Sequence, residues 1–266
     1  MKFFLLSCLL FTSLFNNIQA AALDKKGKWY FYYGWNRATY TTSDYRLTGD
    51  GYDFTLKNVK AKDTQSEIGL DPYLHPTNWS VPQTNIRMGY YLTDTLSVSF
   101  GNDHMKYVME RNQTVRFEGN INTGGNFDGV QDGDDIQITD DLLVFEHTDG
   151  LNYFSFELEK FLPLWSSKTG ENALSIFTGP GIAIMYPKTN ATLFGQSRND
   201  EFNVAGYGLS IKAGVEFILY ERFFARLVAK YGEIRMHNVR TTSNSSDKLS
   251  QEFNFTEAYI VFGGMF

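Results

Sequence analysis

The chain alternates between apolar and polar residues in a series of segments, each bounded by turn-forming residues. Alternation with a period of two places successive side chains on opposite faces of a β-strand. Eight of these segments exceed the ~9–11 residues that a tilted strand needs to cross a bilayer. They are residues 28–40, 82–93, 95–109, 151–162, 173–187, 202–220, 223–239 and 252–266. The pattern therefore predicts an all-β protein with eight antiparallel strands.

The connections between these segments alternate in length. The turns around Asp94 and Glu221 and the connection 161–172 are short or moderate. The other four connections are longer and polar, and they span residues 41–81, 110–150, 188–201 and 240–251. Short turns at one mouth and long loops at the other are typical of an up-and-down transmembrane barrel. An even number of strands also places both chain ends on the periplasmic side.

Residues 52–56 alternate as well, and they follow the turn signal at residues 49–51. One additional spanning strand would place the two chain ends on opposite sides of the membrane. We therefore interpret this segment as part of a hairpin that continues the first strand above the membrane. The alternative is a ten-stranded barrel that also recruits residues 114–121 or 136–145.

Charged residues in the predicted strands fall on the face opposite the large apolar residues. In segment 202–220, Val215 and Phe217 alternate with Gly214 and Glu216. A charged side chain that faces lipid near mid-bilayer costs about 2–4 kcal/mol, so the polar face is expected to line the lumen. The predicted lumen network consists of Arg87, Glu157, Glu159, Lys212, Glu216, Arg226, Lys230, Glu257 and Tyr259. Because side chains fill an eight-stranded barrel, we expect a largely plugged lumen, with a narrow pore as the alternative.

Residues 103–107 contain the densest ionisable cluster on a predicted strand. Strict alternation from Phe100 would point His104 and Lys106 towards lipid. A β-bulge near Gly101 would turn these two side chains inward and send the intervening Met105 outward. The cost of placing charge in hydrocarbon favours the bulge, which we therefore expect.

The composition favours a membrane barrel over a water-soluble one. Aromatic residues make up 16% of the chain, although its mean hydropathy is −0.30. Aromatic girdles at both membrane interfaces, combined with a polar lumen and polar loops, give this combination. The net charge of −6 argues against nucleic acid as a partner.

The N-terminal segment has the three parts of a secretory signal peptide. Lys2 provides a positive charge, residues 3–15 form an apolar run, and residues 20–22 form an alanine cleavage site. The run is shorter than the ~20 residues of a spanning helix. We therefore predict a Sec-type signal peptide over residues 1–22 and a barrel domain over residues 23–266. The single cysteine, Cys8, lies in the signal, so the mature barrel is expected to have no disulfide.

The last predicted strand is amphipathic and ends on an aromatic residue. Ala258, Ile260, Phe262, Gly264 and Phe266 share its apolar face. A strand of this kind with a terminal phenylalanine resembles the signal that the outer-membrane assembly machinery recognises, with Phe262 and Phe266 as its apolar positions. Gly264 departs from that signal, which often has a larger apolar residue there.

The mature chain resembles the small eight-stranded outer-membrane barrels of Gram-negative bacteria, such as the OmpA, OmpX and OmpW types. The resemblance implies a multi-pass location in the outer membrane, with outer-membrane lipid, lipopolysaccharide and the assembly machinery as partners. It implies neither a cofactor nor a nucleic-acid partner. Long extracellular loops on a compact scaffold are commonly functional, so the expected role is structural or surface-binding, with an unidentified extracellular ligand.

Two groups of residues suggest further chemistry. The second long connection contains weak candidates for calcium ligands at Asp128, Asp132, Asp134 and Asp135, but their spacing is not that of an EF-hand, so no metal site is predicted. None of the four histidines belongs to a His-x-Ser pair like that of PagL-type lipid A deacylases. The loop histidines His75 and His147 lie near Asp71 and Asp149, with Ser80 also nearby. A lipid A-modifying enzyme therefore remains the second alternative, and no catalytic residue is assigned.

Overall fold

The computed structural model describes residues 23–67, 69–73, 75 and 81–266, so the predicted signal peptide lies outside the described residues. The eight long strands are β1 (Trp29–Tyr40), β5 (Thr84–Thr93), β6 (Leu96–His104), β11 (Tyr153–Ser166), β12 (Ala173–Met185), β15 (Gly206–Leu219), β16 (Phe223–Arg240) and β17 (Lys248–Met265). The described shorter elements are β2 (Ser43–Gly49), β3 (Tyr52–Val59), β4 (Ala61–Lys62), α2 (Leu70–Tyr73), β7 (Tyr107–Met109), β8 (Thr114–Ile121), β9 (Asp135–Gln137), β10 (Leu143–His147), β13 (Lys188–Leu193) and β14 (Asn199–Phe202). Within the described ranges, no helix has the length and apolar character needed to cross a membrane.

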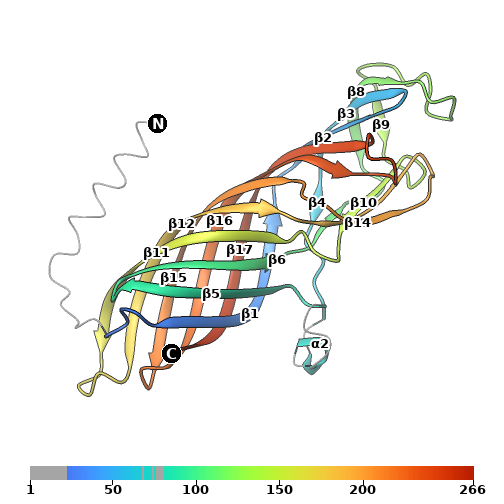
Figure 1. Ribbon diagram of the computed structural model, residues 1–266. Coiled ribbons are helices and arrows are strands. Elements are labelled where there is room, and N and C mark those ends of the chain that lie inside the picture. Colours follow the sequence, from blue (N-terminus) through green and yellow to red (C-terminus); the bar gives the residue numbers. More distant parts are fainter. Residues whose placement is uncertain (1–22, 68, 74, 76–80) are drawn as a thin grey trace.

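The eight long strands form a closed antiparallel ring (Figure 1). Their order is β1-β5-β6-β11-β12-β15-β16-β17, and β17 pairs with β1 from Met265 opposite Tyr30 to Phe255 opposite Tyr40. Each of the eight predicted segments overlaps one of these strands over most of its length, although β11 and β16 end later than predicted and β17 begins earlier. The prediction of an eight-stranded up-and-down barrel is therefore confirmed. The ten-stranded alternative is wrong, because β8, β9 and β10 lie outside the ring.

The outer wall of the ring is apolar. On β15, Leu209, Val215 and Phe217 are 52%, 42% and 39% exposed, whereas Lys212 and Glu216 between them are buried. Large aromatic residues gather near both ends of the wall. Exposed members near the short turns are Trp29, Trp165, Tyr220 and Phe223, and those near the other mouth are Tyr186, Tyr207 and Tyr231. This apolar band between aromatic girdles is the exterior of a transmembrane barrel.

The connections at the mouth opposite the short turns fold into a separate body, and because outer-membrane barrels have short turns on the periplasmic side, we call this body the extracellular head. We define this head as β2, β3, β4, β7–β10, β13 and β14 with the adjoining ends of β16 and β17. The hairpin β2–β3 continues the sheet through the pairing of Thr48 with Lys248, and β8 and β9 extend it further (Figure 1). A second sheet has the order β14-β13-β10-β7-β4. The predicted hairpin is therefore present as β2–β3, which lies outside the eight-stranded ring.

The head has an apolar core of its own. Tyr45, Phe54, Phe117, Phe145 and Phe253 are at most 2% exposed within one continuous cluster of buried residues. Aromatic rings pack directly in this cluster, as between Phe54 and Phe117, whose centroids are 5.3 Å apart. The head is therefore a packed body of two sheets.

The predicted bulge near Gly101 is wrong. The pairing of β6 with β11 keeps one register from Leu96 to Asp103, so alternation continues and Asp103 points into the lumen. His104 lies on the outer face, where its Nδ1 is 2.9 Å from Oδ1 of Asn152. Met105, expected to point outward, is fully buried in the head core. The bulge is unnecessary because the chain enters the head here, so His104 meets a polar partner instead of hydrocarbon.

Candidate functional site: the charged lumen

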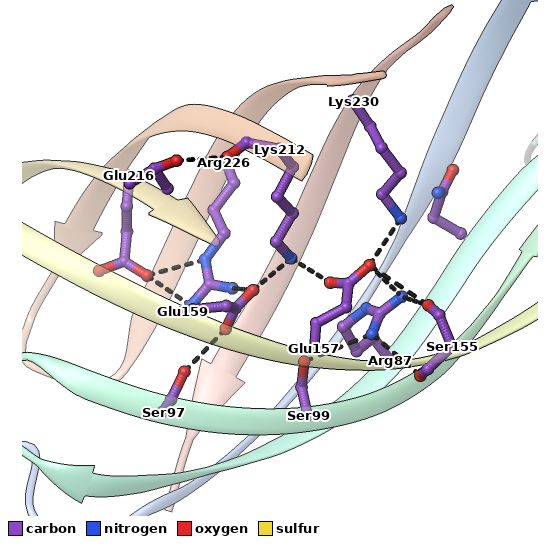
Figure 2. Close-up of polar contacts among 12 residues, drawn as sticks. Arg87, Ser97, Ser99, Ser155, Glu157, Glu159, Lys212, Glu216, Arg226 and Lys230 are labelled. Carbon is purple, nitrogen blue, oxygen red and sulfur yellow. Dashed lines mark hydrogen bonds and ion pairs between the residues drawn. The ribbon is translucent and has the colours of Figure 1, made fainter. Parts of the chain in front are cut away.

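Ten buried charged side chains of the described residues meet inside the barrel. The five cations are Lys25, Arg87, Lys212, Arg226 and Lys230, and the five carboxyl side chains are Asp103, Glu157, Glu159, Glu216 and Glu257. None is more than 4% exposed. Their formal charges balance, and most form a continuous ion-pair network through the lumen, part of which Figure 2 shows. Buried charges are tolerated in proteins when they are paired in this way.

The periplasmic end of the lumen is closed around Glu216. Arg226 binds this carboxylate from β16, with its Nη2 2.6 Å from Oε2 (Figure 2). Lys25 reaches it from the segment before β1, with its Nζ 2.5 Å from Oε1. The Lys25 ammonium also lies 5.1 Å from the ring centroid of Tyr91 and 4.6 Å from that of Phe161. Cation–π contacts therefore add to the ion pairs at this end.

The residues before β1 fold back across the periplasmic mouth. The backbone N–H groups of Lys25 and Lys26 both donate to Oδ1 of Asp94 in the β5–β6 turn, at 3.0 and 2.9 Å. Gly27 then donates to the carbonyl of Tyr91 at 2.9 Å. These bonds hold Lys25 in the lumen.

The middle of the lumen contains a bridge between β15 and β11. Lys212 forms ion pairs with both Glu157 and Glu159, which lie two residues apart on the inner face of β11 (Figure 2). Glu159 also accepts hydrogen bonds from the hydroxyl of Tyr30 and, at 2.7 Å, from that of Ser97. This carboxylate is therefore satisfied from three directions.

The upper part of the lumen contains a pair that spans the ring. Lys230 on β16 binds Asp103 on β6, and these strands lie four steps apart in a ring of eight. The same ammonium lies 2.7 Å from Oε1 of Glu157. Nη2 of Arg87 is 3.1 Å from that oxygen and donates to Oγ of Ser155 at 2.7 Å. Side chains from opposite walls therefore meet at the barrel axis.

Glu257 and Tyr259 join this upper cluster from β17. Oε1 of Glu257 accepts a hydrogen bond from Nδ2 of Asn85 at 2.9 Å, and the same amide also donates to Asp103. The ring of Tyr259 is buried with its centroid 5.6 Å from Nζ of Lys230. The structure thus places all nine predicted lumen residues inside the barrel.

The sequence interpretation missed two charged members of the network. Asp103 was not assigned to the lumen because the predicted bulge interrupted the alternation near Gly101, whereas unbroken alternation from Phe100 places its side chain inside. Lys25 precedes the first strand, so no periodicity pointed to it. Its only sequence signal is its position just after the predicted signal peptide, in the adjacent pair Lys25 and Lys26.

The weak metal candidates are not gathered into a site. Asp128 accepts hydrogen bonds from the N–H groups of Thr123 and Gly124, which lower the pKa of its carboxyl. Asp132 accepts from the N–H of Gly119. These carboxylates stabilise their own loop. Across the described chain, no group of three His, Cys, Asp or Glu side chains is arranged to hold a metal ion.

His104 and His147 show no catalytic arrangement with a serine among the described residues. His104 hydrogen-bonds to Asn152, and His147 is buried beside the rings of Phe145 and Tyr107, at centroid distances of 4.9 and 6.0 Å. Neither ring hydrogen-bonds to a serine hydroxyl among the residues that the structure describes. Ser80, a candidate partner in the sequence analysis, lies outside those residues.

The two predicted assembly-signal residues lie on the outer face at the periplasmic end. Phe262 is 52% exposed and Phe266 is 69% exposed. The N–H of Phe266 donates to the carbonyl of Trp29 at 2.9 Å, and the N–H of Trp29 donates back at 2.8 Å. The last residue is therefore fixed to β1 at the point where the ring closes, with its side chain turned towards lipid.

The closed ring, its apolar exterior and its charged interior define a multi-pass β-barrel of the bacterial outer membrane. No protein-family model matches the sequence, and no curated protein matches it. Similar solved structures include the outer membrane protein OprG from Pseudomonas aeruginosa, with 13% identity, coverage of 92% of this chain and 98% of that chain, and a TM-score of 0.43. Ail from Yersinia pestis has 13% identity, coverages of 91% and 99%, and a TM-score of 0.36. Neisserial surface protein A has 10% identity, coverages of 89% and 98%, and a TM-score of 0.38.

Proposed function

We propose that this protein is a non-enzymatic barrel whose lumen is plugged and whose extracellular head makes contacts at the cell surface. The observation that best supports a plugged lumen is the ion pair between Lys230 and Asp103, which spans the full width of the ring. Arg226 supports it lower down, because its guanidinium carbon lies 4.7 Å from the ring centroid of Tyr30 and 5.2 Å from that of Phe177. Paired charges and packed rings occupy the space that solutes would need.

The head supports a surface-binding role. Its strands hold their outward side chains on a packed core, so the surface is presented by a rigid scaffold. Charged residues cover that surface, as in the exposed pair of Arg46 and Asp53, whose nitrogen and oxygen are 3.0 Å apart. The pair of Arg111 and Asp140, at 2.8 Å, is similarly exposed. A hydrated, charged and rigid surface suits recognition of another hydrated surface.

Electrical recording from planar bilayers tests the plug. The purified barrel, inserted into a bilayer, should give no steady ionic current, because the Lys230–Asp103 pair and the packed side chains below it would block a continuous water path. An outer-membrane porin in the same bilayer serves as the positive control for insertion and recording. Regular ohmic steps from the wild-type protein would overturn the plug and favour the narrow pore.

The non-enzymatic part of the proposal has a separate readout. Mass spectra of lipid A from cells with and without the protein should show the same acyl chains. A change in acylation would overturn this part while leaving the plug untouched. The two measurements therefore fail independently.

A further inference from the structure

The lipid-facing wall has a hollow near the extracellular mouth. Its volume is about 570 Å³, and its lining is Phe100, Phe154, Phe156, Ile182, Ala183, Ile184, Tyr186 and Val204. These residues come from β6, β11, β12 and the connection that follows β12. Ile182 and Val204 are 63% and 59% exposed, so the hollow opens outward and not into the lumen.

A second hollow continues the first one towards the periplasm. It has a volume of about 320 Å³, and it shares Phe156 and Ile182 with the first. Its lining also includes Pro180, in the sequence Gly179-Pro180-Gly181 of β12. The small outward side chain of Pro180 leaves room beside the large side chains of β11. We call the two hollows together the lipid-facing groove.

Aromatic residues build a wall for the groove at its extracellular end. Tyr186 and Phe202 stack with ring centroids 5.4 Å apart, and the ring of Phe154 lies 6.4 Å from that of Tyr186. Tyr186 and Phe202 come from the two ends of the head connection between β12 and β15, and Phe154 comes from β11. The groove is thus bounded by the same connection that enters the head.

The position and length of the groove match one leaflet of the membrane. The distance along β12 from Pro180 to Tyr186 is six residues, or about 20 Å at ~3.3 Å per residue. The hydrocarbon core of a bilayer is ~30 Å thick, so tilted strands place a groove of this length within about half of it. Since the groove lies at the extracellular end, that half is the outer leaflet.

We propose that the lipid-facing groove binds one acyl chain of lipid A. The groove meets hydrocarbon in the membrane, and its lining is almost entirely aliphatic and aromatic. The outer leaflet of this membrane consists of lipopolysaccharide, whose acyl chains belong to lipid A. A chain held between the β11 aromatic residues and β12 buries apolar surface on both sides. The lipid is therefore fixed at this face of the barrel.

Native mass spectrometry of the folded barrel in detergent, titrated with hexa-acylated lipid A, tests this assignment. Ile182→Trp places a large ring at the residue that both hollows share. We expect wild type to retain one lipid A molecule and Ile182→Trp to bind it about tenfold more weakly, equivalent to about 1.4 kcal/mol. Leu227→Trp on β16 is the matched control, because Leu227 is equally exposed at 63% and lies away from the groove.

The outcomes distinguish a specific lipid A site in the groove from nonspecific lipid binding to the outer face of the barrel. Retention in Leu227→Trp should equal wild type, and heat-modifiable gel migration should show that both variants fold. Equal retention by Ile182→Trp and Leu227→Trp would overturn the proposal. A parallel titration uses phosphatidylethanolamine with saturated chains. Equally tight binding of that lipid, equally weakened by Ile182→Trp, would overturn the assignment to lipid A.

Discussion

The membrane-spanning barrel and the extracellular head are built from continuous strands, yet they bury opposite kinds of side chain. On β17, Glu257 points into the lumen, whereas Phe255 and Phe253 on the same face lie in the apolar core of the head. On β16, Lys230 is followed on the inner face by Ile234. The interior therefore changes from charged to apolar within four residues of one strand.

At the same height, the outer face changes from apolar to charged. Along β16, Leu227 and Tyr231 are exposed to lipid, and the next outward residues, Glu233 and Arg235, form an ion pair. A strand has the same geometry on both sides of this boundary, so backbone pairing does not decide which residues are buried. The surrounding medium decides it: a lipid exterior requires apolar side chains outside, and water permits charge there.

The largest expected effect comes from removing a lumen charge. Glu157→Gln keeps the shape of a side chain that contacts Arg87, Lys212 and Lys230, but leaves these buried cations with less compensation. Breaking a buried ion-pair network costs about 3–5 kcal/mol. Urea unfolding of the barrel in detergent micelles measures the free energy of unfolding.

The matched control for this change lies in the head. Glu252→Gln removes a carboxylate whose Oε1 is 3.2 Å from Nη2 of Arg235, where both side chains are exposed. An exposed pair contributes at most about 1 kcal/mol, so this variant should unfold almost like wild type. Equal losses in the two variants would contradict the contrast between a buried lumen network and a hydrated head surface.

Valine-to-lysine substitutions on the two outer faces give the next largest effect. Val215 faces lipid from the middle of β15, and a lysine there should cost about 2–4 kcal/mol. Val144 faces outward from β10 in the head, where a lysine should change stability by less than about 0.5 kcal/mol. Comparison of the unfolding free energies of Val215→Lys and Val144→Lys measures the difference between the two media. A similar cost at both positions would place Val144 against lipid as well.

Much of the barrel follows from one sequence property, the period of two. Alternation identified each strand and the inward position of residues such as Lys212 and Glu216, because hydrocarbon excludes charge from the other face. The exclusion of charge from hydrocarbon was also the reason for the wrong bulge near Gly101, because it was applied to His104, which lies beyond the height at which the strand leaves the membrane. Sequence alone does not mark that height, which depends on how the strands tilt and pair.

The head and the N-terminal segment show what periodicity leaves out. β10 and β13 pair across sequence separations of 44 to 50 residues, as at Phe145 and Ala191, and short strands of this kind give weak local signals. Lys25 enters the lumen only because Asp94 and Tyr91 hold the backbone of residues 25–27. Both features depend on contacts between residues far apart in the chain, so local patterns do not contain them.

A buried histidine gives the smallest of these effects and is expected to make the stability of the head depend on pH. Burial of His147 between the rings of Phe145 and Tyr107 lowers the pKa of its imidazole to about 3, compared with ~6.5 in an unfolded chain. Between these values the unfolded state binds the extra proton, so the stability of the head is complete above pH 6.5 and falls as the pH is lowered towards 3.

The expected loss between pH 6.5 and pH 5 is about 2 kcal/mol, since each pKa unit is worth about 1.4 kcal/mol. Amide hydrogen exchange in β7 and β10, which pair beside His147, reports the opening free energy of the head at both pH values. His147→Leu has no proton to gain there, so its exchange, corrected for the intrinsic chemical rate, should show a flatter pH dependence. The β15–β16 amides of the barrel provide the internal reference, because β10, which contains His147, pairs with β7 and β13 and with neither of these strands. If the variant and wild type lost the same protection in β7 and β10, the acid sensitivity of the head would arise from a group other than His147.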